Sequence, residues 1–113
     1  MKGFTMDVRI LGETVPIEFA PESFINGLCA DDYTYGWFDS KAIKIYINKD
    51  TSPDRQRAAL WHEIAECIDN QLDLRDKPYT HNLMDIQKMV EFQVMHDNPE
   101  IILWISGLSE RNK

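Results

Sequence analysis

The spacing of apolar residues changes its period halfway along this chain, and that change limits the folds the sequence can adopt. Residues 42–48 alternate isoleucine with other residues, in a period of two that is typical of a strand with one packed face. From Pro53 onward, apolar residues recur at steps of three and four, as in an amphipathic helix. Strands followed by helices predict an α+β domain with a small, mainly antiparallel sheet.

The first half contains two predicted hairpins. Residues 8–11 and 15–19 are apolar-rich runs on either side of Gly12-Glu13-Thr14, which is a turn signal. Residues 33–38 and 42–48 form the second pair, around a turn at residues 39–41. Residues 21–30 fit either a short helix or an irregular connection.

The second half contains two predicted long helices and one short helix. Thr51 can cap the first helix, with Asp54 at the third capping-box position, and the helix runs to about residue 74. Thr80 can cap the second helix, which ends at residues 97–99, and Asn98 can cap the third, which runs from Pro99 to about residue 106. The predicted core positions of the two long helices are Ala58, Trp61, Ala65, Ile68 and Leu72, then Leu83, Ile86, Val90 and Val94.

Length and charge restrict the class of protein. A chain of 113 residues with 43% apolar residues is long enough for one domain, predicted to span residues 1–113. The net charge of −7 opposes binding to phosphate backbones, so nucleic acid and anionic membranes are not expected partners. No signal peptide is readable at the start of the chain, and the two cysteines form no CxxC motif. We therefore expect a cytoplasmic protein with reduced thiols.

One motif in the first long helix has the residue types and the spacing of a catalytic metal site. His62 and Glu66 are four residues apart, so they lie one turn apart on the same helix face and could bind one metal ion. Glu63 lies beside them and can reach a water molecule held by that ion. This is the geometry of the HExxH metallopeptidase motif, in which the glutamate is the general base, with Glu66 in place of the second histidine.

A catalytic zinc ion takes three protein ligands and leaves one position open. His81, at the start of the second long helix, is the best candidate for the third ligand, and Asp69 is a weaker one. Tyr46 and Tyr79 are candidates for stabilising an oxyanion. The alternative is that the polar side chains of this helix are simply solvated above an apolar core.

Sequence around this motif resembles small phage and prophage proteins of the zincin type, the minigluzincin-like metallopeptidases. The matching features are the His62-Glu63-Ile64-Ala65-Glu66 helix, the Leu72-x-Leu74 exit and a histidine that opens the next helix. Further matching features are Gln93-Val94, Asp97-Asn98-Pro99 and Trp104. The resemblance as a whole covers about residues 40–105.

This resemblance implies a zinc ion bound by His62, Glu66 and His81, with Glu63 as the base for peptide hydrolysis. It also implies a sheet edge, expected at residues 42–48, that pairs with an extended peptide or protein substrate. The commoner relatives have histidine where this chain has Glu66. An alternative function is therefore a non-catalytic phage or prophage accessory protein, or protein-interaction module, that keeps the fold with or without a structural metal.

Overall fold

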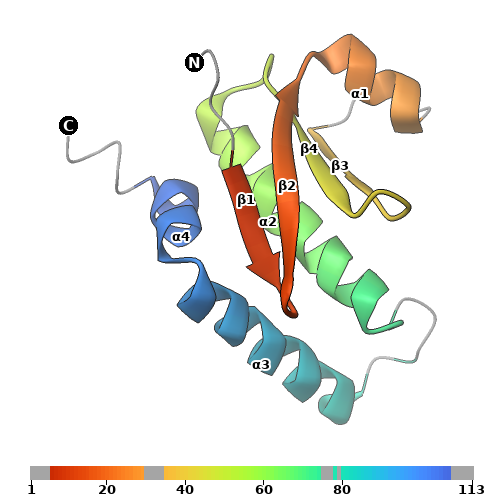
Figure 1. Cartoon of the computed structure of the whole chain (residues 1–113), viewed down its shortest axis with the longest axis vertical. Helices are drawn as coiled ribbons and strands as arrows, with labels where there is room; N and C mark the ends of the chain where they lie inside the picture. The colour runs from red at the N-terminus through yellow and green to blue at the C-terminus, as the bar shows by residue number, and fades with distance from the viewer. Residues whose placement is uncertain (1–5, 30–34, 75–77, 79, 108–113) are drawn as a thin grey trace.

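The computed structural model of the chain describes residues 6–29, 35–74, 78 and 80–107. It is an α+β structure in which a four-stranded mixed sheet lies against helices from the second half of the chain (Figure 1). The elements are β1 (Met6–Ile10), β2 (Glu13–Ala20), α1 (Glu22–Cys29), β3 (Gly36–Asp39), β4 (Lys44–Asn48), α2 (Pro53–Gln71), α3 (His81–Asp97) and α4 (Pro99–Ser106). The predicted fold class is confirmed, and the ambiguous segment at residues 21–30 contains a helix.

The strand order is β1-β2-β4-β3. Two of the three pairings, β1 with β2 and β3 with β4, are antiparallel, and the pairing of β2 with β4 is parallel. The prediction that residues 42–48 form an edge strand is wrong, because β4 is paired on both sides. Local alternation cannot show which strands are central, since that depends on the crossover through α1 and β3. The edges of the sheet are β1 and β3.

The first hairpin turns at Leu11 and Gly12, one residue earlier than predicted. Both residues have positive φ angles, 52° and 84°, as the two central residues of a type I′ turn require. In the second hairpin, Asp39 Oδ1 accepts hydrogen bonds from the backbone N–H groups of Lys41 and Ala42, at 3.0 and 3.1 Å. These bonds hold Lys41 and Ala42 in the turn, so β4 begins at Lys44 and not at residue 42 as predicted.

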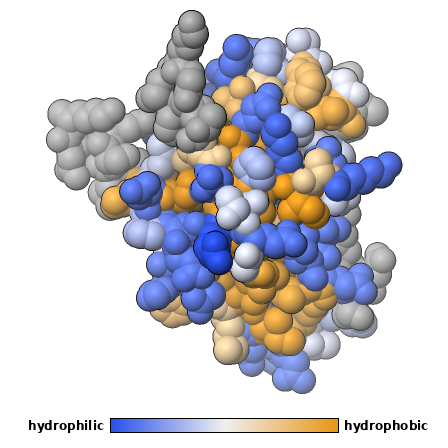
Figure 2. Space-filling model, in the orientation of Figure 1, coloured by the Kyte–Doolittle hydropathy of each residue, from blue (hydrophilic) through white to orange (hydrophobic). Residues whose placement is uncertain are grey.

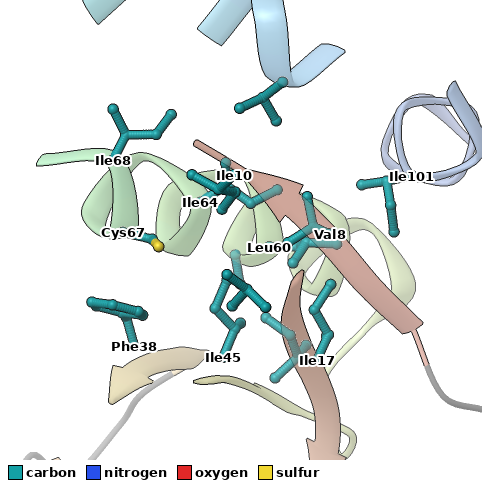
Figure 3. Packing of buried hydrophobic residues seen from close by; sticks show 14 residues of the cluster. Val8, Ile10, Ile17, Phe38, Ile45, Leu60, Ile64, Cys67, Ile68 and Ile101 are labelled. Carbon is teal, nitrogen blue, oxygen red and sulfur yellow. The ribbon is translucent and has the colours of Figure 1, made fainter. Parts of the chain in front are cut away.

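Helix α2 packs against one side of the sheet and forms the centre of the core (Figure 3). Its N-cap is Ser52, whose side chain accepts a hydrogen bond from the Arg55 N–H, so the prediction of Thr51 as cap is wrong. Its buried residues are Ala59, Leu60, Glu63, Ile64, Cys67 and Ile68. Of the predicted core positions, Ile68 is buried, and Trp61 and Leu72 are partly buried and pack against the core. Ala58 is exposed, because the sheet packs on the neighbouring stripe, which carries larger aliphatic side chains.

Helix α3 begins after Thr80, which caps it as predicted through a hydrogen bond from the Leu83 N–H. Leu83 and Val94 are buried, whereas Ile86 is 46% exposed. Val90 is partly buried and packs against the core, so the stripe prediction is confirmed at Leu83, Val90 and Val94 and wrong at Ile86.

Asn98, between α3 and α4, is the N-cap residue of α4 as predicted, but its side chain makes no capping hydrogen bond. Instead, its Oδ1 accepts from the Arg9 N–H at 2.7 Å, and its Nδ2 donates to the carbonyl oxygens of Arg9 and Val94, both at 2.8 Å. The Asn98 side chain therefore bonds the N–H and the carbonyl oxygen of Arg9, which point away from β2, as a neighbouring strand would. At Arg9, the backbone groups on this edge of the sheet already have hydrogen-bond partners.

Within the part of the chain that the structure describes, no helix is long and apolar enough to cross a membrane.

Candidate functional site

Helix α2 carries three of the predicted site residues at the boundary between its buried face and solvent. The side chain of His62 is 69% exposed, that of Glu66 is 39% exposed, and that of Glu63 is only 9% exposed. His62 Nε2 lies 3.7 Å from Glu66 Oε1 and 4.0 Å from Glu63 Oε2. The helix therefore brings the imidazole and both carboxylates together, as the spacing of the motif predicts.

Glu63 lies against β3. A Cβ atom added at Gly36 would be 3.1 Å from Glu63 Cγ and 3.2 Å from the Tyr46 carbonyl oxygen. Contacts below 3.4 Å are tighter than most real Cβ contacts, so glycine allows α2 and β3 to approach this closely. The sequence signal for this contact is Gly36, a glycine inside a strand pattern, which marks a place where another part of the chain can approach the strand closely.

Burial raises the pKa of Glu63 from its ordinary value of 4.5 to about 7. The nearby His62 opposes this rise, the carboxylate of Glu66 adds to it, and a hydrogen bond with the backbone of Phe38 opposes it. Glu63 is therefore a carboxyl group that exchanges its proton near neutral pH, next to an exposed imidazole.

The edge of β3 that points away from β4 can be located from the register of these two strands. The N–H of Asn48 donates to the Tyr35 carbonyl oxygen at 2.8 Å, two residues from the directly opposed pair Trp37 and Tyr46. Hydrogen-bonded and non-hydrogen-bonded pairs alternate along an antiparallel ladder, so the backbone groups of Gly36 and Phe38 point away from β4. Glu63 is hydrogen-bonded to this outward-facing backbone at Phe38.

The predicted third ligand lies elsewhere. His81 is an exposed residue in the first turn of α3. No three His, Cys, Asp or Glu side chains among the described residues form a group that could hold a metal ion. The structure therefore brings together His62, Glu63 and Glu66 but does not bring His81 to them.

Asp69, the weaker candidate, accepts a hydrogen bond from Gln87 Nε2 at 2.8 Å and so connects α2 to α3. Tyr46 lies on the side of the sheet opposite α2, where its ring is 5.3 Å from that of Phe24 and 5.0 Å from Lys44 Nζ. The structure thus does not place Tyr46 beside His62. Tyr79 lies outside the described residues.

The spacing of His62 and Glu66 suits a zinc ion. Two ligands at about 2.0–2.1 Å from one tetrahedral ion are roughly 3.3 Å apart, which is close to the 3.7 Å between His62 Nε2 and Glu66 Oε1. An imidazole and a carboxylate are also donors that zinc accepts. This pair fits zinc, and a third protein donor is not supplied by the residues that the structure describes.

Comparisons of the chain with protein-family models, with curated proteins and with solved structures found no match.

Proposed function

We propose that this chain is a zinc-dependent metallopeptidase-like protein of the phage or prophage zincin type. In this proposal His62, Glu66 and His81 bind the metal, and Glu63 is the general base. The observation that supports it best is the cluster of His62 Nε2 with the carboxylates of Glu63 and Glu66, within 4.0 and 3.7 Å, beside the outward-facing backbone of β3.

A zinc ion held by this pair would lower the pKa of a bound water and polarise the carbonyl of a peptide bond. Glu63 would accept the proton of the attacking water and pass it to the leaving amine. A general base works best when its pKa lies near the working pH, and burial brings the pKa of Glu63 to about 7. The contact with β3 would hold this carboxyl group in a fixed position.

The proposed substrate is an extended peptide or a protein segment that pairs with β3 by β-augmentation. The backbone groups of Gly36 and Phe38 face outward, and Glu63 lies at the same edge. The opposite edge, β1, is less suited because Asn98 already bonds both backbone groups of Arg9, whereas on β3 Glu63 bonds the backbone of Phe38 only and would have to yield that bond to the peptide. This assigns peptide pairing to β3 instead of residues 42–48.

Ligation by His81 requires the first turn of α3 to approach α2 when metal binds. The hydrogen bond between Asp69 and Gln87 connects the two helices two turns further along α3 and would act as the pivot. His81→Ala should then weaken zinc affinity strongly, whereas unchanged affinity would remove His81 from the ligand set.

The first experiment is the metal content of the purified protein by plasma mass spectrometry, before and after zinc is added back. We expect near-stoichiometric zinc in the wild type, and its loss in His62→Ala. The matched control is His96→Ala, which removes an 81% exposed histidine on α3 and should leave zinc unchanged. Glu63→Gln should keep the metal and abolish peptide hydrolysis; hydrolysis that survives this change would exclude Glu63 as the base.

A second candidate function is the non-catalytic phage or prophage accessory protein or interaction module. The observation that favours it is that the described residues supply two metal donors where a catalytic zinc takes three. A wild-type protein that binds no zinc, even in excess, would support this function and exclude the peptidase.

A further inference from the structure

Strand β3 carries an exposed aromatic side chain, Trp37, on the side of the sheet that faces away from α2. Trp37 is directly opposite Tyr46 in the register of β3 with β4. Directly opposed residues project to the same side of a sheet, so the indole ring lies on the side of Tyr46. Its neighbour Phe38 is buried, whereas Trp37 is 36% exposed. Because the open face of such a sheet normally carries polar residues, Trp37 is an unusual residue at this position.

Aromatic side chains on this side of the sheet form a row that reaches β3, and we call Phe24, Tyr46 and Trp37 the aromatic row. The ring of Phe24, on α1, is 5.3 Å from the ring of Tyr46, and Tyr46 is opposite Trp37. Figure 2 shows hydrophobic surface over α1, at the upper right of the view, where Phe24 is 44% exposed. The aromatic row therefore runs from α1 across β4 to Trp37, on an edge strand of the sheet.

An antiparallel peptide paired with β3 would place a side chain at the end of this row. Gly36 and Phe38 direct their backbone groups away from β4, so the peptide residues opposite them would form hydrogen-bonded pairs. The peptide residue between these two is opposite Trp37 in a non-hydrogen-bonded pair. In such a pair the two Cα atoms are only about 4.5 Å apart and the side chains are close together. The side chain of this residue would therefore lie against the indole ring.

The two sides of the peptide would meet different surroundings. On the α2 side, a Cβ atom at Gly36 would already be 3.1 Å from Glu63 Cγ, so the helix lies close to the strand. A large peptide side chain on that side would meet α2. On the other side, the neighbour of the peptide is the partly exposed ring of Trp37. The position opposite Trp37 is therefore the one at which a large side chain fits.

We propose that Trp37 selects peptides that carry a large apolar residue, such as phenylalanine or leucine, at the position opposite it. This inference rests on the proposed function, because it requires an extended substrate paired with β3. Trp37 is then a specificity-determining residue. It acts by packing on the side of the sheet away from Glu63, so it decides which peptide binds and takes no part in proton transfer.

The exposed part of Trp37 limits the size of this preference. If a tryptophan side chain has roughly 200 Å² of surface, 36% exposure leaves about 70 Å². At the usual free energy of apolar burial, complete coverage of this area changes affinity by about twentyfold. One peptide side chain covers only part of the ring, so we expect a preference of about fivefold for phenylalanine over alanine.

Nuclear magnetic resonance of the ¹⁵N-labelled full chain tests the proposal. The probes are acetylated and amidated pentapeptides of threonine with phenylalanine, leucine or alanine at the centre, titrated to about 10 mM because short peptides bind weakly. EDTA is present, so that neither zinc nor hydrolysis affects the result. We expect the amide signals of Gly36 and Phe38 and the indole signal of Trp37 to shift, and the phenylalanine and leucine peptides to bind about fivefold more tightly than the alanine peptide.

Two variants of Trp37 and one control assign the preference. Trp37→Thr, with a residue that suits an exposed strand position, should reduce the preference to less than about twofold, and Trp37→Phe should keep most of it. The matched control is Phe92→Thr, which removes a 75% exposed aromatic side chain on α3, a helix that packs near β1. It should leave the preference unchanged. Circular dichroism of each variant checks that the fold is retained.

The possible failures of this inference and of the proposed function can be told apart. Equal binding of the three peptides, or a preference that survives Trp37→Thr, would overturn the role of Trp37 and leave the pairing with β3 intact. If no peptide shifts the amide signals of Gly36 and Phe38, both the pairing and this inference are wrong, while the metal content tests the zinc site separately. Shifts of these signals with protein concentration alone would assign this edge to a second copy of the chain and overturn the selection of peptides.

Discussion

Replacing Glu63 by glutamine should stabilise the metal-free protein at pH 8 and leave its stability near pH 4 unchanged. Glutamine has almost the same shape as protonated glutamate, and its carbonyl oxygen can still accept a hydrogen bond from the backbone of Phe38. The substitution therefore removes the charge of a buried group with little effect on packing.

The pH at which the substitution stabilises the protein follows from the pKa of Glu63 in the unfolded chain and in the folded chain. In the unfolded chain Glu63 ionises around its ordinary pKa of 4.5, whereas in the folded chain burial raises its pKa to about 7. Below pH 4.5 both states hold the proton, and no stability is lost. Between these values the folded state binds more protons, so the free energy of unfolding falls as pH rises. Above pH 7 the loss is complete and amounts to about 3 kcal/mol.

Urea denaturation in the presence of EDTA, at pH 4, 6 and 8, measures this loss. The difference between Glu63→Gln and wild type should grow from near zero at pH 4 to a few kcal/mol at pH 8. Glu100→Gln is the matched control, since it changes an exposed carboxylate in the first turn of α4, away from Glu63, and its pH dependence should stay close to that of wild type. Identical pH dependence in Glu63→Gln and wild type would refute the argument that burial destabilises this carboxylate.

Four further substitutions test the fold, each by thermal or urea unfolding. Gly36→Ala should lower stability by about 1–3 kcal/mol, because the added Cβ would be 3.1 Å from Glu63 Cγ; an unchanged stability would mean that α2 and β3 are not so close. Asn98→Ala should cost about 2–3 kcal/mol, because the backbone groups of Arg9 lose their partner, and a loss below about 0.5 kcal/mol would contradict the role given to this side chain. Ser52→Ala should cost about 1 kcal/mol and Thr51→Ala much less, since Ser52 is the cap; the reverse order would restore the cap predicted from the sequence.

Much of the candidate site follows from local sequence. The separation of four residues on a helix is enough to bring His62 to Glu66, because both lie on one rigid element. His81 belongs to another helix, and its distance from Glu66 depends on how α3 packs. On α3, the packing of Leu83 and Val94 against the rest of the protein leaves Met89 and Phe92 exposed on the other side of the helix.

The sequence by itself determined the order of the four strands and of the three helices that follow them, because periods of two and of three to four residues are set by backbone geometry within each element. It also determined the cluster on α2. Tertiary structure decided which of two adjacent stripes of α2 became the core face, and this buried Glu63 and left His62 exposed. It also decided that β3 is the edge strand beside Glu63, because strand order depends on contacts between segments far apart in the chain.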